Sequence, residues 1–160
     1  MYAHTPDERA ARVLVVACRT AADDALMHAV RRRAAVSPSQ FTLIVPRPCQ
    51  GLHRVVDPED HGWREAQTVI DTACPLLADA AGSEVHGLIG SHDPVAAVED
   101  ALNVHGFDEA IVSTLPAHLS RWLHLDLPSK VAGMGVPVTR VTGTGTGAAE
   151  RALDEPRDAA

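Results

Sequence analysis

The chain lacks a long apolar run, and this absence argues against a membrane-spanning helix. None of its uninterrupted apolar segments approaches the ~20 residues that such a helix needs. Residues 1–12 also lack a basic segment followed by a long apolar one, so a secretory signal is not indicated. We therefore expect a cytoplasmic protein with no membrane partner.

Cysteine and positive charge are both scarce. The three cysteines, Cys18, Cys49 and Cys74, form no Cys-x2-Cys pair, which argues against a disulfide framework and against a zinc site. We expect reduced, mostly buried thiols and no bound metal. Acidic residues outnumber basic residues by 21 to 14, for a formal net charge of -7, which disfavours nucleic acid as a partner.

The chain does have enough apolar residues for one domain. It contains 160 residues, 46% of them hydrophobic, which suffices for a core without disulfide or metal staples. We expect this domain to span residues 11–142. Residues 1–10 are expected to be disordered, as is a Gly/Thr-rich and then charged tail over residues 143–160.

Short β-branched runs alternate with longer segments of helical spacing. The short runs predict strands at residues 12–18, 41–46, 83–90, 107–114 and 136–141. The longer segments predict helices at residues 20–35, 63–82, 94–106 and 127–133, the last within a broken helical stretch. The best-bounded helix has Asp93 as its cap, Pro94 at its first position and Gly106 at its end. A long irregular connection is expected over residues 47–61.

This alternation predicts an α/β fold. We expect a five-stranded parallel doubly wound sheet in the order 3-2-1-4-5, flavodoxin-like or adenine-nucleotide α-hydrolase-like. Ligands of such sheets bind beyond the carboxyl ends of the strands, where the strand order reverses. The expected crevice is lined by residues 17–20, 45–47 and 113–116.

Four segments carry a resemblance to a known family. The start VLVVAC, the segment GFDEAIVST, the stretch SRWLHLDLPSKV and the closing GVPVTRV together resemble a universal stress protein domain over residues 11–142. ATP-binding members of that family have a Gly-x2-Gly-x9-Gly-Ser/Thr loop after the fourth strand and an aspartate after the first. Alignment with that loop places Ser113, Pro116 and Asp126 at its glycine positions. Ala17 or Cys18 stands where the aspartate would be.

These departures predict a degenerate nucleotide pocket. Glycines let the backbone approach phosphates and offer N–H donors, whereas Pro116 has no N–H. Asp126 is expected to cap the helix at 127–133, so its carboxylate would repel a triphosphate from the positive end of that helix. No cofactor is therefore expected.

Several polar groups remain around the expected crevice. The candidate ligand contacts are Ala17, Cys18, Val45, Ser113, Thr114, His118 and Arg121. Serine and threonine also cap helices, and Arg121 also fits a solvated surface. Cys18 is either a packed core residue or, beside Arg19, a reactive thiolate. The run Gly143–Gly147 matches a phosphate loop in composition alone and predicts a flexible tail.

Two hypotheses for the function follow. The first is a non-catalytic stress-response module, not an enzyme, which acts through an unknown protein partner or a modest ligand. The resemblance implies a homodimer paired along the last strand, residues 136–141, which is an unprotected edge. The alternative is a universal stress protein that binds AMP or ATP with Mg through Ser113, Thr114 and Arg121.

Overall fold

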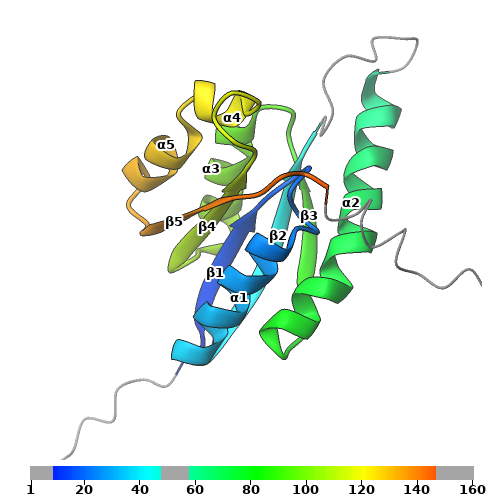
Figure 1. The fold of residues 1–160 in the computed structure, drawn as a ribbon. Helices are drawn as coiled ribbons and strands as arrows, with labels where there is room; N and C mark the ends of the chain where they lie inside the picture. Colours follow the sequence, from blue (N-terminus) through cyan, green and yellow to red (C-terminus); the bar gives the residue numbers. More distant parts are fainter. Residues whose placement is uncertain (1–8, 48–57, 147–160) are drawn as a thin grey trace, which may run out of the picture.

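The protein is an α/β domain with one parallel sheet (Figure 1). A computed structural model describes residues 9–47 and 58–146. The five strands lie in the order β3-β2-β1-β4-β5 and all pair in parallel. Their bounds are β1 (Ala11–Val16), β2 (Ser39–Pro46), β3 (His86–Gly90), β4 (Glu109–Thr114) and β5 (Val138–Thr142). The predicted fold class and strand order are thereby confirmed.

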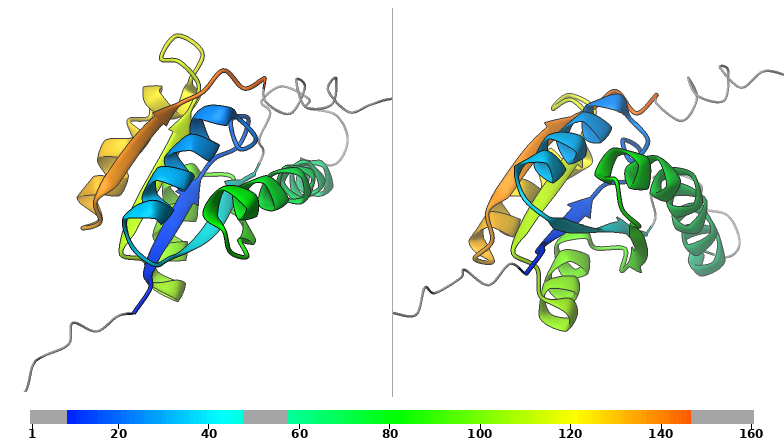
Figure 2. Two further views of the ribbon diagram at one scale, coloured as in Figure 1. Left: turned by 60° about the horizontal axis from the view of Figure 1, so that its bottom comes forward. Right: turned by 90° about the horizontal axis from the view of Figure 1, so that it is seen from below.

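Helices cover both faces of the sheet (Figure 2). They are α1 (Asp24–Val36), α2 (Pro58–Ala81), α3 (Pro94–His105), α4 (Arg121–His124) and α5 (Leu127–Gly133). Helices α1 and α2 pack on one face, and α3 and α5 pack on the other. Within the described residues, no helix is both long and apolar enough to cross a membrane.

The central strand β1 shows why the sheet needs cover on both sides. Its residues alternate between the two faces because successive strand side chains point in opposite directions. Val13 and Val15 belong to the core beneath α1 and α2, while Leu14 and Val16 belong to the core beneath α3 and α5. All four side chains are fully buried, as a continuous apolar run in a parallel strand predicts.

Helix α3 has the ends that its sequence predicts. The Asp93 side chain accepts a hydrogen bond from Val95 N at 3.0 Å, and Pro94 occupies the first helical position. Gly106 ends the helix with a φ of 66°, a left-handed conformation that glycine adopts without strain.

Two helices begin at other residues than the sequence predicts. The helix expected from residue 20 begins at Asp24 with Asp23 at its cap position, so Thr20 lies in the preceding turn. Helix α2 begins at Pro58, inside the expected connection over 47–61, and continues through Pro75 without a break. The remainder of that connection, residues 48–57, lies outside the described residues.

The chain beyond β5 continues as a hydrogen-bonded segment. Gly143 N donates to Thr114 O at 2.9 Å and extends the β4–β5 pairing by one step. Gly145 N donates to an oxygen of the Asp23 side chain at 2.8 Å. The tail predicted from residue 143 is therefore packed against the domain as far as Thr146, and residues 147–160 lie outside the described residues.

Candidate functional site

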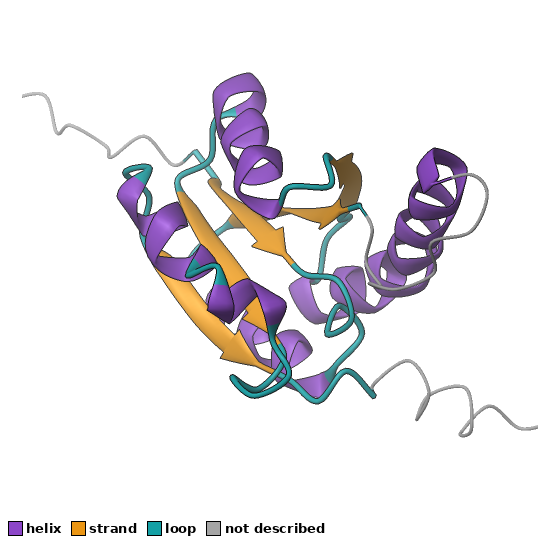
Figure 3. Cartoon of the chain, turned by 90° about the horizontal axis from the view of Figure 1, so that it is seen from above, coloured by secondary structure: helices purple, strands orange, loops and turns teal. Residues whose placement is uncertain are grey.

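The order of strands reverses between β1 and β4, at the centre of the sheet. Val16 pairs with Ile44 of β2 on one side and with Val112 of β4 on the other, so the ends of three strands lie level. After β1 the chain passes to α1 on one face, and after β4 it passes to α4 and α5 on the other (Figure 3). This divergence leaves room at the carboxyl ends of the strands, where parallel sheets bind ligands.

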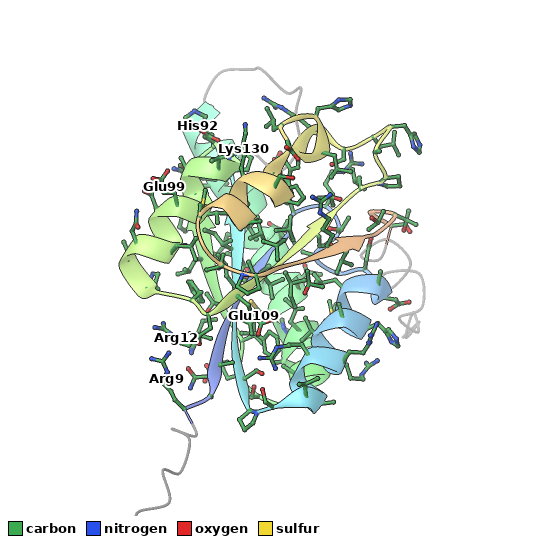
Figure 4. The ribbon with its side chains drawn as sticks, turned by 90° about the vertical axis from the view of Figure 1, so that its left-hand side faces the viewer. Arg9, Arg12, His92, Glu99, Glu109 and Lys130 are labelled. Atoms are coloured by element: carbon green, nitrogen blue, oxygen red, sulfur yellow. The ribbon has the colours of Figure 1, made fainter. Side chains whose placement is uncertain are left out.

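A cavity of about 340 Å³ occupies this position. Its lining residues come from the carboxyl ends of β2 and β4, from the segments that follow β1, β3 and β4, and from the first residue of α3. They are Cys18, Arg19, Thr20, Pro46, His92, Pro94, Ser113, Thr114, Leu115, Leu119, Ser120, Arg121, Trp122 and Leu125. Figure 4 shows His92 at the end of the molecule opposite Arg9 and Arg12, which lie at the amino end of β1.

Four buried hydroxyl side chains form what we call the hydroxyl floor of the cavity. They are Thr20, Ser113, Thr114 and Ser120, each at most 5% exposed. The hydroxyls of Thr20 and Ser113 bond each other at 2.7 Å, and the Ser120 hydroxyl accepts from Leu123 N at 3.2 Å. A hydroxyl carries one donor and two acceptor lone pairs. The Thr20–Ser113 contact uses one of the two O–H donors, so the floor retains hydrogen-bonding capacity for a ligand.

The rim of the cavity combines basic and apolar side chains. Arg19, His92 and Arg121 are exposed and line the opening. Leu119 and Leu125 are also exposed, at 60% and 38%. Within residues 9–47 and 58–146, the side chains that line the cavity include no Asp or Glu. A ligand with an anionic group and an apolar body matches this combination of charges and surfaces.

Trp122 is the aromatic side chain of the cavity. It is half-buried and packs against the cores on both faces of the sheet. A tryptophan in such a position offers a flat apolar surface to a ligand ring. The second tryptophan, Trp63 on α2, is 49% exposed and does not line the cavity.

The structure brings four of the seven sequence-predicted contacts together. Cys18, Ser113, Thr114 and Arg121 line the cavity. The other three do not line it: Ala17 and Val45 are fully buried in the core under α1 and α2, and His118 is exposed. Contact of any of the seven with a ligand stays a prediction.

Cys18 departs from the expectation of a reduced thiol. It is disulfide-bonded and 7% exposed, so it is not available as a reactive thiolate in this state. Cys74 on α2 is free. Burial, and next the negative charge of Asp71, raise the pKa of the Cys74 thiol.

Most cavity residues that the sequence did not single out lie in the segment after β4 or at the end of β3. Leu119, Trp122 and Leu125 occur within the broken helical stretch, where helical spacing suggests core positions. His92 stands directly before the Asp93–Pro94 helix start. The position of His92 after β3 was a usable signal, because every such loop opens at the same edge of a parallel sheet.

No family model matches the chain, and no curated protein matches it. Solved structures do match. A universal stress protein in complex with cAMP shares 15% identity at a TM-score of 0.56, over 84% of this chain and 98% of its own. The universal stress protein of Archaeoglobus fulgidus shares 16% identity at a TM-score of 0.57, over 82% of this chain and 93% of its own. The same protein in complex with dAMP gives a TM-score of 0.54 at 16% identity, over 82% and 97% of the two chains. The chain therefore has the universal stress protein fold.

Proposed function

We propose that the protein is a non-catalytic, ligand-responsive module whose cavity binds a small molecule of the nucleoside monophosphate class. One observation carries the proposal: among the residues that the structure describes, the cavity at the strand-order reversal joins a hydroxyl floor to a rim with three basic side chains and no acidic one. Basic side chains and hydroxyls bind a phosphate group, while Trp122 and the rim leucines suit a base.

Three features favour one phosphate over three. The volume of about 340 Å³ is at the lower end of the range of ~300–1,000 Å³ typical of small-molecule pockets. Pro116, in the loop after β4, supplies no N–H to a phosphate, and Asp126 adds a negative charge before α5. Among the matching structures, the bound cAMP and dAMP each carry a single phosphate. We infer that the pocket is degenerate toward ATP.

We also propose a homodimer that pairs along β5. Within the described residues β5 pairs only with β4. Pro137 O accepts from Ala110 N, and Gly143 N donates to Thr114 O, so the odd-numbered residues of β5 face β4. Since backbone groups of a strand alternate between its two sides, the N–H groups of Val138, Arg140 and Thr142 face the open edge. A second copy could satisfy them, as edge strands commonly require.

Calorimetric titration of the purified protein with AMP, adenosine and Mg-ATP tests the ligand class. We expect AMP to bind, adenosine to bind more weakly because it lacks the phosphate, and Mg-ATP to bind no better than AMP. In a Trp63→Phe background, Trp122 is the remaining tryptophan, so a change in fluorescence on titration reports on the cavity directly.

A pair of arginine variants locates the anion. Arg121→Gln removes a basic side chain of the rim, whereas Arg32→Gln removes an exposed charge from α1 that does not line the cavity. A charge-assisted hydrogen bond contributes about 1.5–3 kcal/mol, so Arg121→Gln should weaken AMP binding by roughly tenfold or more. Arg32→Gln should leave the affinity unchanged.

Absence of any heat or fluorescence response in the titrations would reject the nucleotide proposal and leave the module to act through a protein partner. Tighter binding of Mg-ATP than of AMP would reject the degeneracy.

A further inference from the structure

The segment Gly143–Thr146, which we call the C-terminal strap, lies next to residues that line the cavity. It is tied at two points: Gly143 N donates to Thr114 O at 2.9 Å, and Gly145 N donates to Asp23 Oδ2 at 2.8 Å. Within the strap, the hydroxyls of Thr144 and Thr146 lie 2.7 Å apart. These bonds join residues after β5 to the loop after β1 and to the end of β4.

The side chain of Asp23 holds the strap by accepting a hydrogen bond from Gly145 N. Its side chain is only 3% exposed, and although Asp23 occupies the cap position of α1, its carboxylate makes no capping bond to that helix. A buried carboxylate requires strong partners, and a backbone N–H is one of the best of them. The Gly145 N–H is such a partner, 122 positions away along the chain.

An added side chain at either glycine of the strap would meet neighbouring side chains at close range. A Cβ on Gly143 would overlap Asp23 Oδ2 and lie 3.2 Å from Thr20 Cβ. A Cβ on Gly145 would lie 2.8 Å from Leu115 Cδ2 and 3.8 Å from Arg19 Cβ. Gly145 also has a φ of 78°, which other residues rarely adopt.

Three of the side chains nearest to the glycines of the strap also line the cavity. Thr20 belongs to the hydroxyl floor, Arg19 to the basic rim, and Leu115 to the wall between them. The strap therefore supports these three cavity residues without lining the cavity. Its glycines allow the close approach, and the hydrogen bond from Gly145 N to Asp23 Oδ2 holds it in place.

We propose that Asp23 is a positioning residue for the cavity, which it shapes by holding the C-terminal strap against Thr20, Arg19 and Leu115. Release of the strap gives these three side chains room to move, so the cavity loses its preorganised form and its affinity for a ligand falls. Linkage is reciprocal, so a ligand that fixes Arg19 and Leu115 also protects the strap against opening. The affinity part of this inference rests on the proposed function; the effect on the empty cavity does not.

Two substitutions disrupt the contact between the strap and Asp23 in different ways. Asp23→Ala removes the acceptor of the Gly145 N–H, and Gly143→Ala pushes the strap away by steric overlap while every cavity residue stays intact. Asp23→Asn keeps a carbonyl acceptor and serves as the rescue. The matched controls are Asp24→Ala, at an exposed carboxylate next in sequence, and Gly133→Ala, where an added Cβ meets nothing within 4 Å.

Amide hydrogen exchange of Gly143–Thr146 and the methyl signals of Leu115 are measured first, without ligand. Both opening substitutions should raise the exchange rate of the strap by about tenfold or more and shift the Leu115 signals; the controls and Asp23→Asn should do neither. Affinity for AMP is measured next. It should fall at least about fivefold for the two opening substitutions, the lower end of typical coupling between sites. AMP should also slow exchange of the strap in the wild-type protein.

The two readouts separate failure of this inference from failure of the proposed function. Unchanged exchange and unchanged Leu115 signals in a folded Gly143→Ala variant overturn the positioning role, whatever binds. Changed exchange and Leu115 signals, with no AMP binding by the wild-type protein, support the positioning role and reject the proposed ligand. Faster strap exchange with unchanged AMP affinity overturns the coupling to the cavity. If Asp23→Ala does not fold, Gly143→Ala alone decides.

Discussion

The hydroxyl oxygens of Thr20 and Ser113 lie 2.7 Å apart, although 93 positions separate the two residues in the chain. Thr20 follows β1 and Ser113 is the next-to-last residue of β4, so this buried contact joins the two strands on either side of the strand-order reversal. It fixes the hydroxyl floor of the cavity, because both residues line it.

Removal of either hydroxyl should destabilise the fold. Thr20→Val and Ser113→Ala each leave the other hydroxyl buried without its partner, at a cost of about 1–3 kcal/mol. The double variant should cost less than the sum of the two single variants, because neither polar partner remains. Urea unfolding followed by circular dichroism measures these free energies, with exposed Thr142→Val as the control. Strict additivity would show that the two hydroxyls do not depend on each other.

A second prediction concerns the ion pair at the other end of the sheet. Arg33 Nη2 lies 2.6 Å from Glu109 Oε1, and the two side chains are 19% and 20% exposed. The same guanidinium donates to the hydroxyls of Ser37 and Ser39 at 3.0 and 3.1 Å. Arg33→Gln leaves Glu109 unpaired and should lower the free energy of unfolding by about 1–3 kcal/mol, below the ~3–5 kcal/mol of a fully buried pair. The neighbouring exposed Arg32→Gln should change it by less than ~0.5 kcal/mol. Equal effects of the two substitutions would contradict a specific role for the pair.

The cysteines give a chemical test. Without a reductant, iodoacetamide should leave Cys18 unmodified, because Cys18 is disulfide-bonded. It should modify Cys74 slowly, because only the thiolate reacts and the raised pKa reduces its fraction near pH 8. Peptide mass spectrometry across a pH series measures both. Asp71→Asn removes the charge that adds to the pKa of Cys74, so the rate at pH 8 should rise, while Asp79→Asn serves as the control. A Cys18 alkylated before reduction would show that the disulfide is absent.

The proposed dimer is tested at a backbone donor of the β5 edge. Arg140→Pro removes the N–H that faces the open edge and leaves the bonds to β4 in place, and proline is tolerated on edge strands. We expect the wild-type protein to sediment as a dimer and Arg140→Pro as a monomer. Arg140→Ala keeps the N–H and should remain a dimer. A wild-type monomer at micromolar concentration would reject the dimer, and a dimeric Arg140→Pro would place the contact elsewhere.

Much of the fold could be predicted, because its signals are local. A β-branched run such as residues 12–18 is nearly sufficient evidence for a buried parallel strand. The Asp93, Pro94 and Gly106 pattern identified α3 to within a residue. Strand order followed from the general rules for connections in α/β sheets.

The candidate site was predicted only in part. Ala17 and Val45 are close to strand ends, as expected, but both side chains point into the core under α1 and α2. Nearness to a strand end does not decide the face on which a side chain lies, because the face changes with every residue. Similarly, the turn after β4 places His118 at the surface outside the cavity and Leu119 on its rim.

The sequence alone determined which segments become strands and helices, since periodicity and caps act over a few residues. Only the tertiary structure decided that Thr20 meets Ser113 and that Asp23 meets Gly145, since such contacts join residues 93 and 122 positions apart. Both depend on how the loops after β1, β4 and β5 converge at one edge of the sheet. That convergence is set by packing of whole elements, which no short stretch of residues encodes.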